Sequence, residues 1–405
     1  MPRAGKGCPQ DRKGAAVFFY SMLTGHGDDI YKYKDIRINF SSNVYNHFCH
    51  DGLYAHLASR MDCIRNYPPP TPSELEKEIA SLHGISPDEV IVTNGATEAI
   101  YLIAQAFSQA TSQILQPTFT EYEDACRMYG HETGDGCWVL GDSGQQYKIN
   151  AESQSRKENK NSVSSRLSVQ NTNHQHPSPN TQHLIWLCNP NNPTGQVIPK
   201  EMLESEIASH PDIIFVIDES YAPFTKEPLI ECKNQFPNVI LLHSMTKEFA
   251  IPGLRIGYIT GSASLLSRIR KCRMPWAVNQ LAIEAAHYLI AHRSDYALDL
   301  TALMEERERM ARELSAIDGI TVYPSDTHIL LCRIEGTTAS QFKDFLANNH
   351  GILIRDASNF QGFDEHDFRI AVQTREEDEQ LIKVLRRPLP PPSPVGREPE
   401  SAKTN

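Results

Sequence analysis

The sequence predicts an α/β protein, with a large three-layer αβα domain around a mostly parallel sheet and a smaller α/β domain on its C-terminal side. Three observations lead to this prediction. The chain has 405 residues, enough for more than one domain. Several nearly continuous apolar runs end in polar residues, as strands that are buried on both faces do. Amphipathic helical patterns stand before and after these runs.

The first predicted elements are a helix, a strand, a glycine turn and a second helix. Residues 73–83 (SELEKEIASLH) show the apolar spacing of one helix face, and Ser73 followed by Glu76 matches a capping box. A short strand at 90–92 follows, then the turn in TNGATEAI and a long apolar helix from about Thr97. A strand, a glycine turn and a helix in this order present backbone N–H groups to an anion.

The centre of the sheet is predicted from four apolar runs that follow a polar segment. Residues 141–182 are rich in Ser, Gln and Asn, which predicts a mobile surface insertion of unknown role. The four runs after it are LIWLCNPNNPTG, IIFVIDESYAPF, NVILLHSMTKEF and LRIGYITG. The polar residues that end each run are expected at the carboxyl edge of the sheet, where α/β proteins bind their ligands.

The C-terminal part predicts the smaller domain. After Ser262 the pattern turns helical, and ALDLTALMEERERMARELSAI is strongly amphipathic. ITVYPSDTHILLCRI and DFRIAVQT are typical of strands. The predicted parts of the chain are a flexible leader (1–25), an N-terminal arm that forms part of the small domain (26–70), the large domain (71–265), the connecting helix and small domain (266–386) and a disordered Pro-rich tail (387–405).

Composition narrows the class of partner and the compartment. The net charge is −11 and the pI about 5.8, which argues against nucleic acid or an anionic membrane as the main partner. The nine cysteines are scattered without a C-x-x-C pair or zinc-site spacing, as expected in a reducing cytoplasm. No apolar run approaches the roughly 20 residues of a membrane span. The stretch DRKGAAVFFYSML only faintly resembles a secretory signal, and Met22 is an alternative start.

Lys247 is the first candidate for chemistry. A lysine that ends a strand is most often a solvated surface residue, but three features favour a functional role. The run VILLH precedes it, Ser244 and Thr246 place hydroxyl groups beside it, and Arg255 follows after the turn in AIPGL. A lysine with hydroxyl groups and an arginine is what a phosphate-bearing aldehyde cofactor needs, because the amine forms a Schiff base and the donors hold the phosphate.

Asp218 and an asparagine-rich turn complete the pattern. Asp218 ends the run IIFVID, and a carboxylate buried there needs a partner. A protonated pyridine nitrogen would serve, as in pyridoxal 5′-phosphate, and Tyr221 could reach the phenolic oxygen of that ring. The alternative for this acidic pair is a helix cap or a metal site, but no histidine pair has ligand spacing, so we expect no metal. The segment NPNNPTG (189–195) predicts a rigid turn with uncharged donors.

Taken in order, NPNNPTG, DESY and SMTKEFAIPGLRIGY resemble the fold-type I enzymes that use pyridoxal phosphate, the aminotransferase class I/II superfamily. YPPPTPSELEKEIA, TNGATEAI and FRIAVQT fit the same pattern, and the resemblance extends from about residue 26 to 386. It implies that Lys247 is the Schiff-base lysine, that Asp218 pairs with the pyridine nitrogen, and that Phe119 stacks on the ring. Tyr221 and Asn192 would bind the ring oxygen.

The resemblance also implies how the phosphate is held and how the chain assembles. The backbone at Ala96 and Thr97 would bind the cofactor phosphate, together with Ser244 and Arg255. Tyr67 would reach the phosphate in the neighbouring subunit. A homodimer with shared active sites is therefore expected.

The substrate contacts point to two near relatives within the superfamily, the threonine-phosphate decarboxylases of cobalamin biosynthesis and the histidinol-phosphate aminotransferases. Arg369 would clamp the substrate carboxylate as a bidentate fork, although an edge salt bridge is the alternative. His26 would contact the substrate phosphate and Arg355 would be another anion contact. Asn43, a further substrate-binding candidate, lies in INFSSNVY, which resembles a decarboxylase segment. Asp28 stands where the threonine-phosphate decarboxylases usually have a glycine.

Decarboxylation and transamination differ in which substrate bond stands perpendicular to the cofactor ring. The bond that breaks is the one held perpendicular to the cofactor ring, so the pose of the substrate carboxylate decides between loss of CO₂ and removal of the Cα proton by Lys247. The sequence does not give this angle. The resemblance favours the decarboxylase, which makes (R)-1-aminopropan-2-yl phosphate from L-threonine O-3-phosphate, over the aminotransferase. A non-catalytic module and a nucleotide-binding oxidoreductase are disfavoured, because the expected catalytic residues are present and no G-x-G-x-x-G follows a strand.

Overall fold

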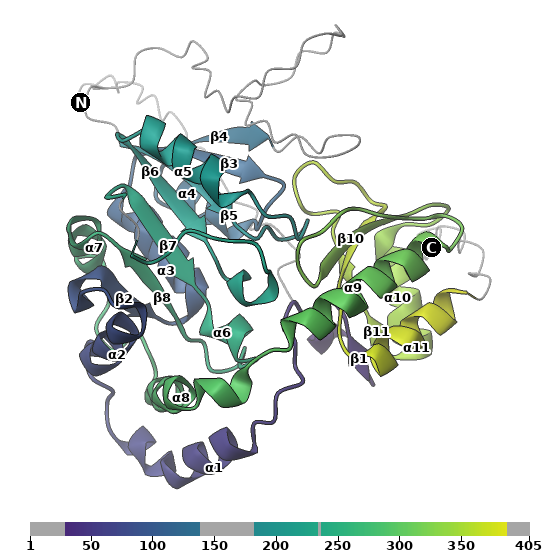
Figure 1. The fold of residues 1–405 in the computed structure, drawn as a ribbon, viewed down its shortest axis with the longest axis horizontal. Coiled ribbons are helices and arrows are strands. Elements are labelled where there is room, and N and C mark those ends of the chain that lie inside the picture. The colour runs from purple at the N-terminus through teal and green to yellow at the C-terminus, as the bar shows by residue number, and fades with distance from the viewer. Residues whose placement is uncertain (1–28, 138–181, 234–235, 387–405) are drawn as a thin grey trace, which may run out of the picture.

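The computed structural model describes residues 29–137, 182–233 and 236–386. The predicted leader, His26, Asp28, nearly all of the predicted insertion at 141–182 and the Pro-rich tail lie outside these residues. Within them, the chain forms a large sheet with helices on both faces and a smaller sheet with its own helices (Figure 1). The predicted α/β class with a mostly parallel sheet is confirmed.

The large sheet has seven strands in the order β2-β8-β7-β6-β5-β3-β4. The pairs from β4 through β3, β5 and β6 to β7 are parallel, and β8 is antiparallel to both β7 and β2. The bounds are β2 Val90–Thr93, β3 Thr111–Gln116, β4 Glu132–Cys137, β5 His183–Cys188, β6 Ile213–Asp218, β7 Val239–His243 and β8 Gly257–Gly261.

Helices cover both faces of this sheet because successive strand residues point to opposite sides. In β6, Ile214 and Val216 belong to the core cluster that contains residues of α3 and α4, whereas Phe215 and Ile217 belong to the cluster that contains residues of α5. The nearly continuous apolar runs therefore fill two core layers. The helices of this part are α2 Ser73–His83, α3 Gly95–Ala106, α4 Glu121–Met128, α5 Lys200–Ser209, α6 Met245–Glu248, α7 Ala263–Arg270 and α8 Gln280–Ala291.

The smaller sheet is antiparallel, in the order β12-β13-β10-β9, and the strand pair β1-β11 stands beside it. Helix α9 runs between the two parts of the molecule (Figure 1). The bounds are β1 Ile38–Asn39, β9 Ile320–Val322, β10 Ile329–Ile334, β11 Ile352–Leu353, β12 Arg355–Asp356, β13 Asp367–Ala371, α9 Leu300–Ser315, α10 Ala339–His350 and α11 Arg375–Leu385. The amphipathic helix and the strands predicted for this region are confirmed.

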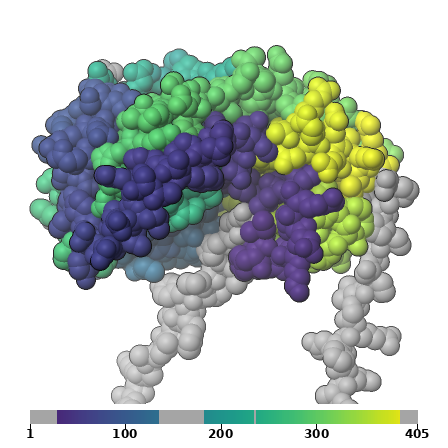
Figure 2. Space-filling view, turned by 90° about the horizontal axis from the view of Figure 1, so that it is seen from below, coloured from purple at the N-terminus to yellow at the C-terminus, as the bar shows by residue number. Residues whose placement is uncertain are grey.

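The N-terminal segment links the two parts from outside. Its strand β1 pairs with β11 of the smaller part, and α1 (Asp51–Ser59) packs against α8 of the larger part. Figure 2 shows these purple residues running along one face of the molecule from the yellow C-terminal helix to the large domain. The short 3-10 helices are η1 Ile30–Lys32, η2 Met61–Arg65, η3 Pro87–Glu89, η4 Ala222–Phe224 and η5 Arg293–Tyr296.

One local prediction is wrong although its helix is confirmed. Helix α2 has the predicted bounds, but its N-cap is Pro72, and no side chain caps it. The side chain of Glu76 points into the protein, where it accepts the backbone N–H of Val92 and forms ion pairs with Arg270 and Arg273. The two guanidinium groups and the backbone N–H give the buried carboxylate its partners, so tertiary contacts override the local capping signal.

Candidate active site

The predicted site residues lie just beyond the carboxyl ends of the parallel strands. Asp218 is the last residue of β6, Asn192 follows β5, and Ser244 follows β7 as the N-cap of α6. Lys247 lies in α6, a single turn of helix between β7 and the turn that leads to β8. Because these strands are adjacent and parallel, their ends meet at one edge of the sheet, as the sequence predicted.

Lys247 is held by a residue from the N-terminal segment. Its Nζ donates to Oδ1 of Asn43, and Nδ2 of Asn43 donates to the hydroxyl oxygen of Tyr221. The Nζ atom lies 6.0 Å from the centroid of the Tyr221 ring. Burial raises the pKa of Tyr221 although the charge of Arg369 opposes this effect, so the phenol is protonated at neutral pH. The amide of Asn43 thus joins the two side chains that the sequence placed on the cofactor.

Asp218 is a buried carboxylate that accepts hydrogen bonds at both of its oxygens. It is 5% exposed, its Oδ1 accepts the backbone N–H of Ser220 at 2.9 Å, and its Oδ2 accepts the hydroxyl of Tyr122 at 2.7 Å. Burial raises the pKa of Asp218, and these hydrogen bonds and the charge of Lys247 oppose the rise. A protonated pyridine nitrogen beside this carboxyl would lower its pKa further, so the site fits the ring of pyridoxal 5′-phosphate.

Two backbone segments that were predicted to bind phosphate approach each other closely. Gly95 opens α3 at φ +80°, and a Cβ built there would lie 2.5 Å from Nη2 of Arg255. A Cβ on Gly257 would lie 2.9 Å from the backbone nitrogen of Ala96. Arg255 and the first turn of α3, with Ala96 and Thr97, therefore lie together. A helix N-terminus beside a guanidinium is suited to a phosphate group.

Two buried arginines stand opposite each other in the smaller sheet. Arg355 of β12 and Arg369 of β13 are Cα partners across the antiparallel pair. Arg369 donates from Nη1 to Oδ1 of Asn192 and from Nη2 to the carbonyl of Ser41, so it reaches the large domain. Arg355 donates to Oδ1 of Asn359 at 2.8 Å, and burial lowers its pKa. A buried guanidinium that reaches Asn192, with a second buried arginine on the neighbouring strand, is suited to an anionic substrate.

Phe119 and Tyr67 take different places. Phe119 precedes α4, is half-buried and packs edge-on against Tyr122, with 5.8 Å between ring centroids. Tyr67 is 86% exposed, and its ring lies 5.6 Å from that of Trp276. The structure therefore brings Phe119 to the edge of the sheet but leaves Tyr67 on the surface of the single chain. His26 lies outside the described residues.

The structure adds two residues that the sequence analysis missed. Tyr122 of α4 donates to Asp218, a contact with a strand end 96 residues away that no local pattern indicated. His328 is fully buried, and its ring lies 3.9 Å from that of Phe224. Burial and the charges of Arg369 and Lys247 lower the pKa of His328 to about 3, so it is neutral. Nothing in its sequence context indicated this position.

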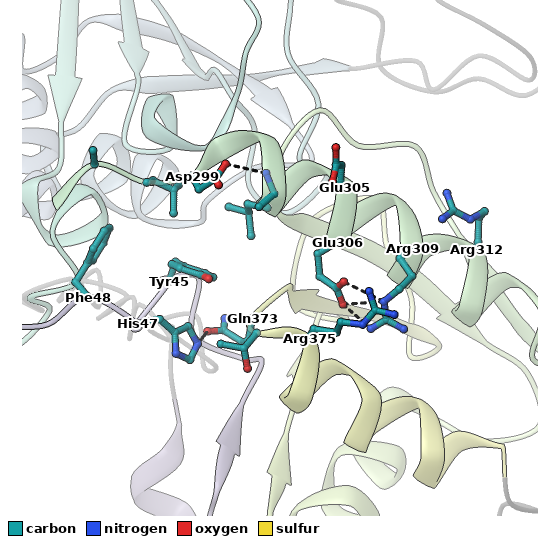
Figure 3. A pocket seen from close by; sticks show the side chains of 15 residues that line it. Tyr45, His47, Phe48, Asp299, Glu305, Glu306, Arg309, Arg312, Gln373 and Arg375 are labelled. Atoms are coloured by element: carbon teal, nitrogen blue, oxygen red, sulfur yellow. Dashed lines mark hydrogen bonds and ion pairs between the residues drawn. The ribbon is translucent and has the colours of Figure 1, made fainter. Parts of the chain in front are cut away.

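A separate cavity lies next to the segment that carries Asn43. It has a volume of about 620 Å³ and is lined by Tyr45, His47 and Phe48, by the first turns of α9 and by residues 373–375 (Figure 3). None of the predicted site residues lines it. The side chain of Gln373 donates to the carbonyl of Val44 at 3.5 Å, so the wall of this cavity supports the Asn43 segment.

Within residues 29–137, 182–233 and 236–386, no cluster of His, Cys, Asp and Glu side chains is arranged to hold a metal ion. In the same residues, no helix has the length and apolar character required to cross a membrane. The seven cysteines whose side chains are described there are all free thiols.

The fold is that of the class of enzymes that use a phosphorylated aldehyde cofactor, and the residues at the carboxyl edge of its mostly parallel sheet fit such a cofactor. The chain belongs to the aminotransferase class I and II family, whose family model matches residues 35–385. Its cofactor is pyridoxal 5′-phosphate.

Known relatives carry two different activities. The structure of L-threonine-O-3-phosphate decarboxylase from Porphyromonas gingivalis is 34% identical with a TM-score of 0.75, and the match covers 86% of this chain and 98% of that chain. Threonine-phosphate decarboxylase of Salmonella typhimurium is 28% identical, covering 88% of this chain and 92% of its own. Histidinol-phosphate aminotransferase of Caldanaerobacter subterraneus is 29% identical, covering 80% and 85%.

Proposed function

We propose that this protein decarboxylates L-threonine O-3-phosphate to (R)-1-aminopropan-2-yl phosphate as a step of cobalamin biosynthesis. The observation that carries the proposal is the likeness to the Porphyromonas gingivalis decarboxylase, which is 34% identical across 98% of that chain. The paired arginines support it, because the substrate brings a carboxylate and a phosphate to one site. When bound, pyridoxal phosphate supplies an electron sink that stabilises negative charge on the substrate carbon.

The residues of this chain have distinct roles in the proposed reaction. Arg369 binds the substrate carboxylate, and Arg355, with its buried guanidinium on the neighbouring strand, binds the substrate phosphate. Asn43 orients the amine of Lys247 and the hydroxyl of Tyr221 through its two hydrogen bonds. After CO₂ leaves, Lys247 donates a proton to the substrate carbon that had carried the carboxylate.

The test is to incubate the purified protein with pyridoxal phosphate and O-phospho-L-threonine and to measure CO₂. We expect release without any 2-oxo acid acceptor, in an amount equal to the aminopropanol phosphate formed. A reaction that needs 2-oxoglutarate, yields glutamate and releases no CO₂ would refute the proposal.

A histidinol-phosphate-type aminotransferase is the alternative. Its specific support is the Caldanaerobacter subterraneus relative, which at 29% identity is about as similar to this chain as the Salmonella typhimurium decarboxylase. In this alternative, Lys247 removes the Cα proton and an amino group passes to 2-oxoglutarate. Assaying histidinol phosphate with 2-oxoglutarate in parallel distinguishes the two activities.

The proposed assembly is a homodimer in the cytoplasm. Large apolar side chains that a partner subunit could cover are exposed at Met61, Ile64 and Tyr67 and at Met274 and Trp276. The free thiols support a reducing compartment.

Shared active sites can be tested by mixing two variants. A dimer of Lys247→Ala with Tyr67→Ala contains one site in which both residues are intact, because the lysine comes from one subunit and the tyrosine from the other. We expect each variant alone to be impaired and the refolded mixture to regain activity. A mixture no more active than its components would exclude a shared site.

A further inference from the structure

Tyr122 donates a hydrogen bond to one oxygen of Asp218 from the buried core. Its hydroxyl donates to Oδ2 of Asp218 at 2.7 Å, and the residue is 1% exposed. The other carboxylate oxygen accepts the backbone N–H of Ser220 at 2.9 Å. Ser220 also stabilises the carboxylate through its side chain, whereas the Tyr122 hydroxyl reaches it from a different element, α4.

The ring of Tyr122 is fixed by its neighbours. It stacks on Trp186 with 6.1 Å between centroids and meets Phe119 edge-on at 5.8 Å. The indole of Trp186 is anchored in turn, because its Nε1 donates to Oγ of Ser112 at 3.1 Å. A buried aromatic ring packed on two others cannot change rotamer without opening the core, so the direction of the hydroxyl is set in advance.

The hydroxyl is a permanent donor. Burial and the charge of Asp218 raise the pKa of Tyr122 well above its usual range, so the proton stays on the phenol wherever the protein is folded. A charge-assisted hydrogen bond of this kind stabilises the ionised carboxyl and opposes the effect of burial. The titratable groups around Asp218 are Tyr122 of α4, Cys188 of β5, Lys247 of α6, and Glu219 and Tyr221 beside it in the chain.

We propose that Tyr122 is a positioning residue that keeps Asp218 ionised and oriented for the ring nitrogen of pyridoxal phosphate. This role rests on the assignment of Asp218 to that nitrogen. It does not depend on whether the enzyme decarboxylates or transaminates its substrate, so it can fail or succeed separately from the proposed function.

The first test is the affinity of the apoprotein for pyridoxal phosphate, followed by the quenching of protein fluorescence. Tyr122→Phe removes the hydroxyl and keeps the ring, and we expect the dissociation constant to rise about 10- to 100-fold at neutral pH, the equivalent of one charge-assisted hydrogen bond. The matched control is Tyr101→Phe, because Tyr101 donates to Oε2 of Glu121 at 2.9 Å and does not touch Asp218. The control should bind the cofactor as the wild type does.

The second test is the pH dependence of the affinity, which a merely structural role would not change. Without the hydroxyl, the pKa of Asp218 rises further, so the carboxylate is regained only at higher pH. The ratio of the variant and wild-type dissociation constants should therefore fall as the pH rises. Titrations of the cofactor itself cancel in this ratio. If Tyr122→Phe does not fold, Tyr122→Met, which also lacks the hydroxyl, is measured in the same way.

Asp218→Asn separates the possible failures. If the proposal is right, this variant binds the cofactor weakly and adding Tyr122→Phe changes little, because the hydroxyl acts through the carboxylate. Wild-type affinity in Asp218→Asn would overturn the assignment on which the proposal rests. Additive losses, a deficit that does not vary with pH, or a Tyr122→Phe variant as tight as the Tyr101→Phe control would each overturn the proposal itself.

Discussion

The contact between Gly95 and Arg255 gives a sharp test of the phosphate cradle. Gly95 has φ +80°, and a methyl group there would lie 2.5 Å from Nη2 and 3.0 Å from Cζ of Arg255. A Gly95→Ala change therefore adds two effects. The left-handed backbone of an alanine costs about 1–2 kcal/mol of folding stability, and the guanidinium must move away from the first turn of α3.

The second effect can be isolated with a matched glycine. Gly130 has φ +71° and no atom within 4 Å of its built Cβ, so Gly130→Ala carries the backbone cost without the displacement. Both variants should lose about 1–2 kcal/mol in urea unfolding of the apoprotein. Only Gly95→Ala should also lose a charge-assisted contact to the phosphate. This contact is worth about 1.5–3 kcal/mol, so the affinity for the cofactor should fall roughly 10- to 100-fold.

The assay is a fluorescence titration of each apoprotein with pyridoxal phosphate, beside urea unfolding of the same samples. We expect the two variants to be destabilised equally, but Gly95→Ala to bind pyridoxal phosphate more weakly than Gly130→Ala. If Gly95→Ala and Gly130→Ala bind the cofactor equally well, Arg255 and the start of α3 do not hold the phosphate, and the cradle is assigned wrongly.

Three further predictions follow from the same contacts. Lys247→Ala should abolish the visible absorbance of the lysine-bound cofactor, and a spectrum and activity like those of the wild type would contradict its assignment. Arg369→Lys loses the planar fork that reaches Asn192 and Ser41, so KM for the amino acid should rise about 10- to 100-fold, whereas inhibition by aminopropanol phosphate, which has no carboxylate, should stay constant. Burial and Glu306 raise the pKa of Asp378 to about 8, so the folded state binds the extra proton and stability should fall as pH rises from about 4 to 8. Asp378→Asn should flatten this dependence in urea unfolding, and an unchanged slope would contradict it.

Local sequence was sufficient where the chemistry lies close to the ends of consecutive strands. Asn192, Asp218 and Lys247 each follow an apolar run, and the ends of adjacent parallel strands necessarily meet at one edge. The glycine turn before α3 was likewise predictable, because a positive φ at the start of a helix needs a glycine. These features depend on backbone geometry within a few residues.

Contacts between distant segments were not predictable from local pattern. Glu76 matched a helix cap, but it is drawn inward by Arg270 and Arg273, which lie 194 and 197 residues away in the chain. The local capping pattern contains no information about partners so far away in the chain. Tyr122 likewise reaches Asp218 across 96 residues.

The sequence by itself determined the class of fold, and it predicted a cofactor lysine and a carboxylate for the ring, because each of these signals lies in a short run of residues around one strand end. Only the tertiary structure brought Asn43 to Lys247 and set Arg355 opposite Arg369. Those placements depend on how the N-terminal segment and the smaller sheet pack against the large domain. Packing of that kind is decided by the whole core, and no single segment of the sequence encodes it.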